Sequence, residues 1–324
     1  MNIGEIAKLA GVSSAAVSRY FNHGYISEEK KEAIRKVVEE TGYRPSLQAQ
    51  ALRTKKTRMI GVIVPKIASA SIGKVVEGIL SVLNNSEYQT LMAVTQNNPE
   101  KELEYLETFS DRQVDGVILV ATVLTKKHKK VLKQSGVPVV LVGQQFPGLY
   151  CVYHDDYHAS YELTSAVIGK GRRRLGYISA ILEDRAVGEE RYRGFCDAAR
   201  EAGCENAAEQ YVISDFTMEG GYRKAGQLLK AYPDLDGILC ATDTIALGTV
   251  RYLKEQGGNA LSRILVAGHG DSDMSRIAAA PLMTVHYSYK KSGELAVQMM
   301  LDILEGEDPA VREMKLGFSL VDPE

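Results

Sequence analysis

Short apolar runs alternate with polar, helix-forming stretches from residue 59 to the end of the chain. Near-continuous apolar strands separated by helices are typical of parallel sheets covered on both faces. The pattern runs through four strands and then restarts, which predicts an α/β body of two similar lobes with doubly wound parallel sheets. The expected strands are 59–65, 89–94, 116–121 and 138–143 in the first lobe, and 175–180, 210–215, 237–241 and 264–268 in the second.

The N-terminal residues follow a helical spacing instead. Apolar side chains between Ile3 and Ala10 fall on one face of a first helix, and Gly11 supplies the left-handed residue that ends it. Ser13 can cap a second helix, SAAVSRYFN, and a third is expected from near Ser27 to the break at 41–42. Helix, tight glycine turn and helix predict a three-helix unit with a helix-turn-helix core.

Charge separates this N-terminal part from the rest. The chain has 39 Lys and Arg against 41 Asp and Glu, but residues 1–58 hold eleven basic and six acidic side chains, a net charge of +5, which leaves −7 for the remainder. A basic unit joined to a mildly acidic body is typical of a module that binds a polyanion. A chance fluctuation in charge is the alternative.

A helix-turn-helix unit places its second helix in the major groove of DNA. Arg19 could then form the bidentate contact to guanine, while the small side chains around it reach bases or phosphates. A three-helix bundle with no role in DNA binding is the alternative. The predicted contacts from this helix are Ser13, Ser14, Ala15, Ala16, Ser18, Arg19 and Asn22.

The segment YRPSLQAQALRTKKTR, at residues 43–58, is a candidate hinge. Ala49 and Leu52 lie three residues apart on one helical face, but so short a helix is expected to order only when it pairs with a second copy on DNA. Leu52 could then enter the minor groove and kink the duplex, with Arg53 on a nearby phosphate. A basic linker is the alternative.

The chain resembles the LacI/GalR family of bacterial repressors. The resemblance rests on IGEIAKLAGVSSAAVSRYFN, ISEEKKEAIRKVVEETGYRPS and AQALRTKKTRMIGVIVP, and continues through VDGVIL, VYHDDYHA, ERYRGF, TDTIALG and PLMTV. It implies a headpiece at 1–45, a hinge helix and linker at 46–58, and a body at 59–324 that resembles periplasmic binding proteins and carries effector binding and dimerisation.

The resemblance also implies a function. A sequence-specific transcription regulator is expected, a repressor of carbohydrate-utilisation genes that a small sugar-like effector controls allosterically. Its expected partners are a near-palindromic double-stranded DNA operator, a sugar or sugar phosphate, and a second copy of the chain. The C-terminal residues lack the leucine heptads that would join two dimers, so a homodimer is expected.

Three effector contacts follow from positions matched to the family, and Arg185 is added because it lies six residues before Arg191. Three more lie where the chain departs from the family's motifs. Arg191 falls at the effector-binding arginine of the R-x-x-G-F pattern, and Phe216 at an aromatic wall of the pocket. A surface salt bridge and core packing, respectively, are the alternatives. In the family pattern Thr242 replaces an asparagine and Gly270 an acidic residue, so the effector's chemistry is left open. The full set of expected contacts is Asp155, Arg185, Arg191, Phe216, Thr242, Asp243 and Asp271.

Other kinds of site find little support in the sequence. The four cysteines are irregularly spaced, the HDDYH stretch alternates its side chains between opposite faces, and GKGRRR lacks the spacing of a phosphate loop. We therefore expect no metal, no cofactor and no catalytic set. The sequence shows neither a signal peptide nor a membrane span, which favours a cytoplasmic protein. The alternative function is a sugar-binding protein or sugar-processing enzyme on the same two-lobe fold.

Overall fold

The computed structural model describes residues 1–22, 24–43, 56–111, 113–204, 206–278, 282–307, 309 and 311–322. The chain forms two compact units, Met1–Arg58 and Met59–Glu324. The expected hinge contacts Ala49, Leu52 and Arg53 lie outside the described residues. None of the helices in the described ranges combines the length and apolar composition needed to cross a membrane.

The described residues of the N-terminal unit form three helices, α1 (Ile3–Leu9), α2 (Ser14–Phe21) and α3 (Glu28–Thr41). Ser13 caps α2 by accepting a hydrogen bond from the backbone N–H of Ala16, and Gly11 adopts a φ of 65° in the turn before it, both as predicted. The small core of this unit consists of Ile6, Ala7, Ala16, Val17 and Ile34.

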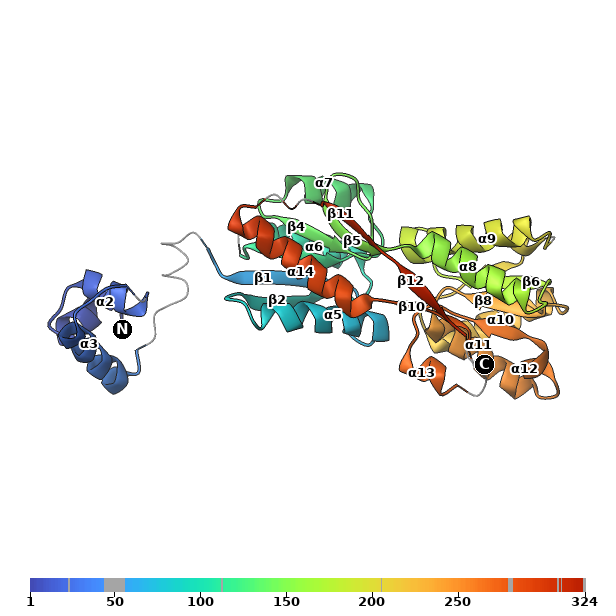
Figure 1. The fold of residues 1–324 in the computed structure, drawn as a ribbon, viewed down its shortest axis with the longest axis horizontal. Helices are drawn as coiled ribbons and strands as arrows, with labels where there is room; N and C mark the ends of the chain where they lie inside the picture. Colours follow the sequence, from blue (N-terminus) through green and yellow to red (C-terminus); the bar gives the residue numbers. More distant parts are fainter. Residues whose placement is uncertain are drawn as a thin grey trace. The chain divides into compact units, whose positions relative to one another are not determined.

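The first lobe of the larger unit, called lobe 1, is built on a six-stranded parallel sheet in the order β11-β5-β4-β3-β1-β2. Alternate residues of β1 point to opposite faces, so Val62 packs under α5 and α14 while Ile63 packs under α6 and α7 (Figure 1). The elements are β1 (Met59–Val64), α5 (Ala70–Leu83), β2 (Gln89–Val94), α6 (Pro99–Ser110), β3 (Gly116–Val120), α7 (Lys126–Gln134), β4 (Val139–Val142), β5 (Tyr150–His154), α14 (Tyr289–Glu305) and β11 (Glu313–Leu316).

Lobe 2 repeats this design on a four-stranded parallel sheet in the order β7-β6-β8-β9. Its elements are α8 (Asp156–Gly169), β6 (Leu175–Ser179), the π-helix η1 (Arg185–Glu190), α9 (Arg191–Glu201), the 3-10 turn η2 (Ala207–Glu209), β7 (Tyr211–Ile213), α10 (Met218–Ala231), β8 (Gly237–Cys240), α11 (Asp243–Gln256), α12 (Ala260–Arg263), β9 (Leu265–Ala267) and α13 (Asp273–Arg276). The predicted α/β class with two parallel sheets is confirmed.

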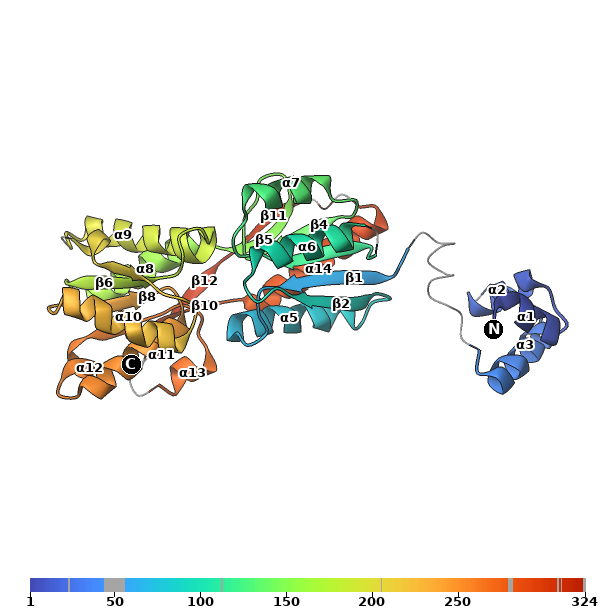
Figure 2. The ribbon, with the colours of Figure 1, turned by 180° about the vertical axis from the view of Figure 1, so that it is seen from behind.

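The chain crosses between the lobes three times, at His154–Asp155, at Ser288 and at Gly317. Beside two of these crossings, β10 (Thr284–Tyr287) and β12 (Phe318–Val321) pair as an antiparallel ribbon of their own (Figures 1 and 2). The sequence pattern did not predict β5, β10, β11 or β12. The C-terminal residues thus complete the sheet of lobe 1 and tie it to lobe 2.

Glycines allow neighbouring helices to pack backbone against backbone. A Cβ atom at Gly78 of α5 would lie 2.0 Å from the carbonyl oxygen of Lys290 in α14, and one at Gly293 would lie 2.2 Å from that of Val75. Such distances exclude any side chain at either position. This close contact fixes α14, which follows the second crossing, against the helix that follows β1.

Candidate functional site

The outer face of α2 carries most of the predicted DNA contacts. Ser14, Ala15, Arg19 and Asn22 are exposed, as is the capping residue Ser13. Ser18 is half-buried, and its carbonyl oxygen accepts a hydrogen bond from the side-chain amide of Asn22. The exposed guanidinium of Arg19 therefore shares this face of α2 with small side chains.

Ala16 does not belong to this face, contrary to the prediction. Its side chain is 6% exposed and packs in the core of the N-terminal unit. Ala16 and Val17 are both buried, so the apolar stripe of α2 that packs in this core is wide enough to include both. A base contact from the methyl group of Ala16 is excluded by this burial.

A cavity of about 150 Å³ lies in the larger unit and is lined by both lobes. This volume is roughly ten times what a single buried water requires, so a small organic molecule can enter. Lobe 1 contributes the residues that follow β1, β3 and β4, and lobe 2 contributes those that follow β8 and β9. The cavity thus lies where the carboxyl ends of two parallel sheets meet, the usual ligand position in such folds.

Arg191 lies in the wall of this cavity and is held by three contacts. Its Nε donates to Asp156 Oδ1 at 2.7 Å, its Nη2 lies 2.7 Å from the same oxygen, and its Nη1 donates to the carbonyl oxygen of Ala241 at 2.6 Å. The guanidinium also stacks over the ring of Tyr287, 4.9 Å from its centre. Because Arg191 and Asp156 are 4% and 5% exposed, they form a buried ion pair. The π-helix η1 directly precedes Arg191 in the chain.

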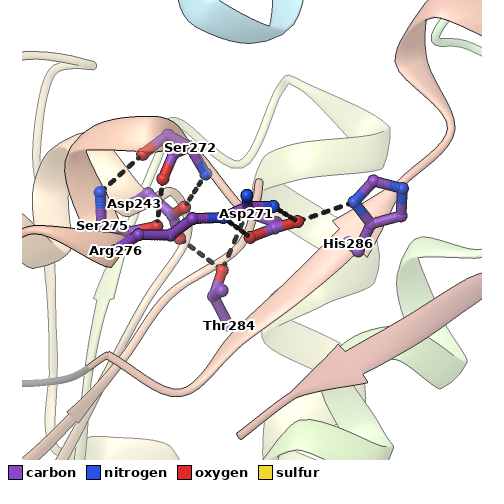
Figure 3. A network of polar contacts seen from close by, with 7 residues as sticks. All are labelled: Asp243, Asp271, Ser272, Ser275, Arg276, Thr284 and His286. Atoms are coloured by element: carbon purple, nitrogen blue, oxygen red, sulfur yellow. Dashed lines mark hydrogen bonds and ion pairs between the residues drawn. The ribbon is translucent and has the colours of Figure 1, made fainter. Parts of the chain in front are cut away.

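Asp243 anchors the part of the wall that follows β8. It accepts hydrogen bonds from the hydroxyl of Thr284 at 2.6 Å and from the backbone N–H of Ser272 at 2.9 Å (Figure 3). Burial raises the pKa of the Asp243 carboxyl, and these hydrogen bonds oppose the shift. Thr242 caps α11 beside it by accepting from the N–H of Ile245. Asp243 thereby joins α11, the loop after β9 and the ribbon strand β10.

Two contacts join the lobes across the cavity. Gln144, after β4, donates from its Nε2 to Asp184 Oδ1 at 2.7 Å, and both side chains are buried. Burial raises the pKa of Asp184 to about 6. On another side of the cavity, Lys66 Nζ lies 5.1 Å from the centre of the Phe216 ring. The relative position of the lobes is thus linked to side chains that a ligand would touch.

Two histidines in the wall are uncharged. His154 ends β5 and His269 follows β9, and burial lowers the pKa of His154 to about 4 and that of His269 well below its usual range. The Nδ1 atom of His269 lies 3.0 Å from the carbonyl oxygen of Cys240, so this nitrogen carries the hydrogen. The position after a strand could have marked His269 and Gln144 as candidates, but no sequence signal distinguishes Asp184.

Comparison with known proteins places the chain in a family. Residues 57–311 match the family described as periplasmic binding proteins and sugar binding domain of LacI family, and residues 2–46 match the bacterial regulatory proteins of the lacI family. The chain belongs to the LacI family. It is 32% identical over 304 residues to the sucrose operon repressor of Staphylococcus xylosus, with 94% of each chain covered.

Solved LacI-family structures share the fold. The complex of the transcriptional regulator CelR with cellobiose is 25% identical, with 99% of this chain and 98% of that one covered and a TM-score of 0.75. The lac repressor dimer bound to operator and the anti-inducer ONPF is 20% identical, with the same coverage and a TM-score of 0.88. At that identity the second likeness concerns the fold alone.

Within this LacI-family body, the structure brings four of the seven predicted effector contacts to the cavity. Arg191, Phe216, Thr242 and Asp243 line it. Their roles in binding an effector stay predictions. The acidic partner of Arg191 is Asp156, which was not among the predicted contacts.

Asp155 and Arg185 lie outside this cavity. Asp155 caps α8 and its carboxylate contacts His158 Nδ1 at 2.9 Å and Lys315 Nζ at 3.3 Å. Arg185 is half-exposed and lies 3.7 Å from Glu190. Both line a neighbouring cavity of about 290 Å³. The acidic residue of this stretch that lines the first cavity is therefore Asp156 and not Asp155, because β5 ends at His154 and the helix begins at Asp156.

Asp271 is also absent from the lining of the cavity. Its carboxylate accepts hydrogen bonds from Arg276 at 2.7 and 3.1 Å and lies 2.8 Å from His286 Nδ1 (Figure 3). The bonds from Arg276 lower the pKa of Asp271, opposed by its burial. Asp271 therefore stabilises the loop after β9, and the neighbouring residues His269, Gly270 and Ser272 face the cavity in its place.

Proposed function

We propose that this LacI-family transcription regulator represses carbohydrate-utilisation genes and is controlled by a sugar that binds in the cavity between the lobes. The observation that carries the proposal is the combination of an exposed arginine on α2 with a ligand-sized cavity built from the strand ends of both lobes. We assign residues 1–45 to a DNA-binding headpiece, 46–58 to a hinge, and 59–324 to effector binding and homodimer formation.

DNA recognition is proposed to depend on α2. In the major groove, the guanidinium of Arg19 can donate two hydrogen bonds to one guanine, while Ser14 and Ser18 contact bases or phosphates. Ala15 offers a methyl contact. Because a homodimer presents two such helices, its operator is expected to be near-palindromic.

The effector is proposed to be sugar-like. The ring of Phe216 offers an apolar face against which a sugar ring can pack, and hydroxyl groups of Ser69, Thr122 and Thr242 line the same cavity. The names of two similar proteins support this class, since one is a sucrose operon repressor and another was solved with cellobiose. A sugar and a sugar phosphate are both candidate effectors of this class.

Control of DNA binding is proposed to follow from the arrangement of the lobes. A ligand that contacts both lobes favours one arrangement over others by its difference in affinity for them. In a homodimer, that arrangement sets the separation of the two chains at Met59, where β1 begins directly after the proposed hinge. If the hinges are held apart, Leu52 cannot enter the minor groove and operator affinity falls.

The DNA-binding part of the proposal is tested by titrating the full chain onto a fluorescent palindromic duplex taken from upstream of its own gene. Arg19→Ala should weaken binding by about 1–3 kcal/mol, the usual value of one bidentate base contact. Lys36→Ala removes the same charge from an exposed position on α3 and should change affinity less. Equal losses in the two variants would contradict base recognition by α2. Binding that does not respond to salt would contradict contacts between the basic N-terminal unit and DNA phosphates.

A further inference from the structure

The charged side chains that line the cavity do not favour the binding of an anion. Among the described residues the lining holds two cationic side chains, Lys66 and Arg191, against three carboxylates, Asp156, Asp184 and Asp243, which leaves a formal charge of −1. A site that selects a phosphate normally presents cationic or N–H donors without nearby carboxylates.

The positive charge of Arg191 is already compensated. Two of its nitrogens lie 2.7 Å from the same oxygen of Asp156, and a third donates to a backbone carbonyl. Both partners are buried, so water screens this attraction little and a ligand anion would have to compete with Asp156 at short range. Arg191 can still donate to a neutral oxygen through its remaining hydrogens.

The other potential cations contribute little. Burial lowers the pKa of His154 and of His269 and so disfavours their charged forms. The charge of Arg191 acts in the same direction on both, while Asp156 opposes the shift at His154. Lys66 is the main feature that would favour an anion, together with the start of α5, where Ser69 makes no side-chain cap. Burial also lowers the pKa of Lys66, and its ammonium group lies over the ring of Phe216.

The rest of the wall suits an uncharged, hydroxyl-bearing molecule. Ser69, Ser71, Thr122 and Thr244 supply hydroxyl groups, and Ile72, Val75, Val187 and Phe216 supply apolar surface. Hydroxyls both donate and accept hydrogen bonds, and the carboxylates of Asp184 and Asp243 can accept further hydrogen bonds from ligand hydroxyls.

We infer that the cavity binds a free, uncharged sugar and rejects the phosphorylated form of the same sugar. The inference rests on the proposed function, because it assumes that a sugar-like effector binds here. Of the two candidate ligand classes, sugar and sugar phosphate, it selects the free sugar. The reasons are the pairing of Arg191 with Asp156 and the excess of carboxylates in the wall.

Calorimetric titration of the full chain with matched pairs tests the inference. The probes are glucose and glucose 6-phosphate, fructose and fructose 6-phosphate, and sucrose and sucrose 6-phosphate. In any pair that binds, the phosphorylated member should bind at least about tenfold more weakly than the free sugar. A phosphorylated member that binds equally well or better overturns the inference and leaves sugar sensing intact. If no member of any pair binds, while the operator duplex is bound, the proposed sugar sensing fails and the inference falls with it.

Asp156→Asn supplies a second, directional test. Removing this carboxylate leaves Arg191 without its ionic partner, so the ratio of free to phosphorylated affinity should fall by at least about tenfold. Asp155→Asn is the matched control, because it removes one negative charge from the adjacent residue outside the cavity and asparagine still caps a helix. Equal ratios in the two variants would contradict the role of Asp156.

Thermal melting reports whether the Asp156→Asn chain folds. If it does not fold, Asp184→Asn replaces it, since Asp184 lines the same cavity and asparagine retains an acceptor for Gln144. Asp184→Asn should shift the ratio toward the phosphorylated sugar as well. An unchanged ratio in this variant would overturn the argument from the charge of the wall.

Discussion

The buried carboxyl of Asp184 is expected to make the stability of the chain depend on pH. It is 2% exposed, and burial raises the pKa of its carboxyl to about 6, despite hydrogen bonds from Val187 and Gln144 that act in the other direction. A raised pKa means that the folded chain binds more protons than the unfolded chain between about pH 4 and pH 6. The contribution of this group to stability is therefore largest at low pH and is lost as the pH rises through 6.

Asp184→Asn should remove that dependence. Relative to the wild-type chain, the variant should gain up to about 3 kcal/mol in free energy of unfolding between pH 4 and pH 7. This value is the increase in the pKa of Asp184 converted to free energy. Urea unfolding of both proteins at pH 4, 5, 6 and 7 measures it. Parallel pH curves would contradict a raised pKa at Asp184.

Single residues also show where prediction from the sequence ends. The motif around Arg191 marked a residue that lines the cavity, because R-x-x-G-F is a local pattern in the chain. Asp155 and Asp156 are adjacent at the junction of β5 and α8, and the sequence does not say which one becomes the helix cap and which one turns inward. Asp184 acquires its partner Gln144 only through folding, forty residues away in the chain.

At the scale of elements, close helix packing depends on glycine. Gly293→Ala should destabilise the chain by about 1–3 kcal/mol, because the added methyl group would overlap the backbone of α5 and force the two helices apart. Gly73→Ala on α5 is the control. Nothing lies within 4 Å of a Cβ atom there, so alanine should stabilise the helix by roughly 0.5–1 kcal/mol.

Thermal or urea unfolding of these two variants measures the change. The same sign of effect in both would show that helix propensity, and not the contact between α5 and α14, determines the outcome. Loss of stability in Gly293→Ala with a gain in Gly73→Ala is the expected pair of results.

The central strands were predictable and the connecting strands were not. β1, β3 and β4 are buried on both faces, so they appear in the sequence as continuous apolar runs such as MIGVIV. β11 and β12 are only partly buried, and their residues EMKL and FSLV give no such run. Their place is determined by pairing with β5 and β10, which are distant in the sequence.

In the whole molecule, operator DNA and sugar are proposed to bind to different sets of residues, so the two affinities can be changed separately. Leu52→Ala should weaken operator binding, because the proposed wedge into the minor groove is lost, and should leave the affinity of the DNA-free protein for sugar unchanged. Anisotropy with operator DNA and calorimetry with sugar measure the two affinities. Equal losses in both would contradict a hinge that acts only on DNA.

The two-unit organisation was visible in the sequence because charge and hydrophobic spacing both change near residue 58. The sequence predicted the position of the cavity, at the strand ends between two lobes, but not its chemistry. Its chemistry depends on which side chains the fold brings together, such as Asp243 with Thr284 and Arg191 with Asp156. These pairs join residues 35 to 41 positions apart, a separation that local sequence patterns do not encode.

Ligand in the cavity is proposed to control binding of DNA by the N-terminal unit. This coupling is tested by titrating the full chain onto its operator duplex, with and without a saturating amount of the free sugar that calorimetry identifies. The sugar should change operator affinity by at least about fivefold, and Phe216→Ala should abolish that change at the same sugar concentration. A sugar that binds in the cavity and leaves operator affinity unchanged would contradict the account.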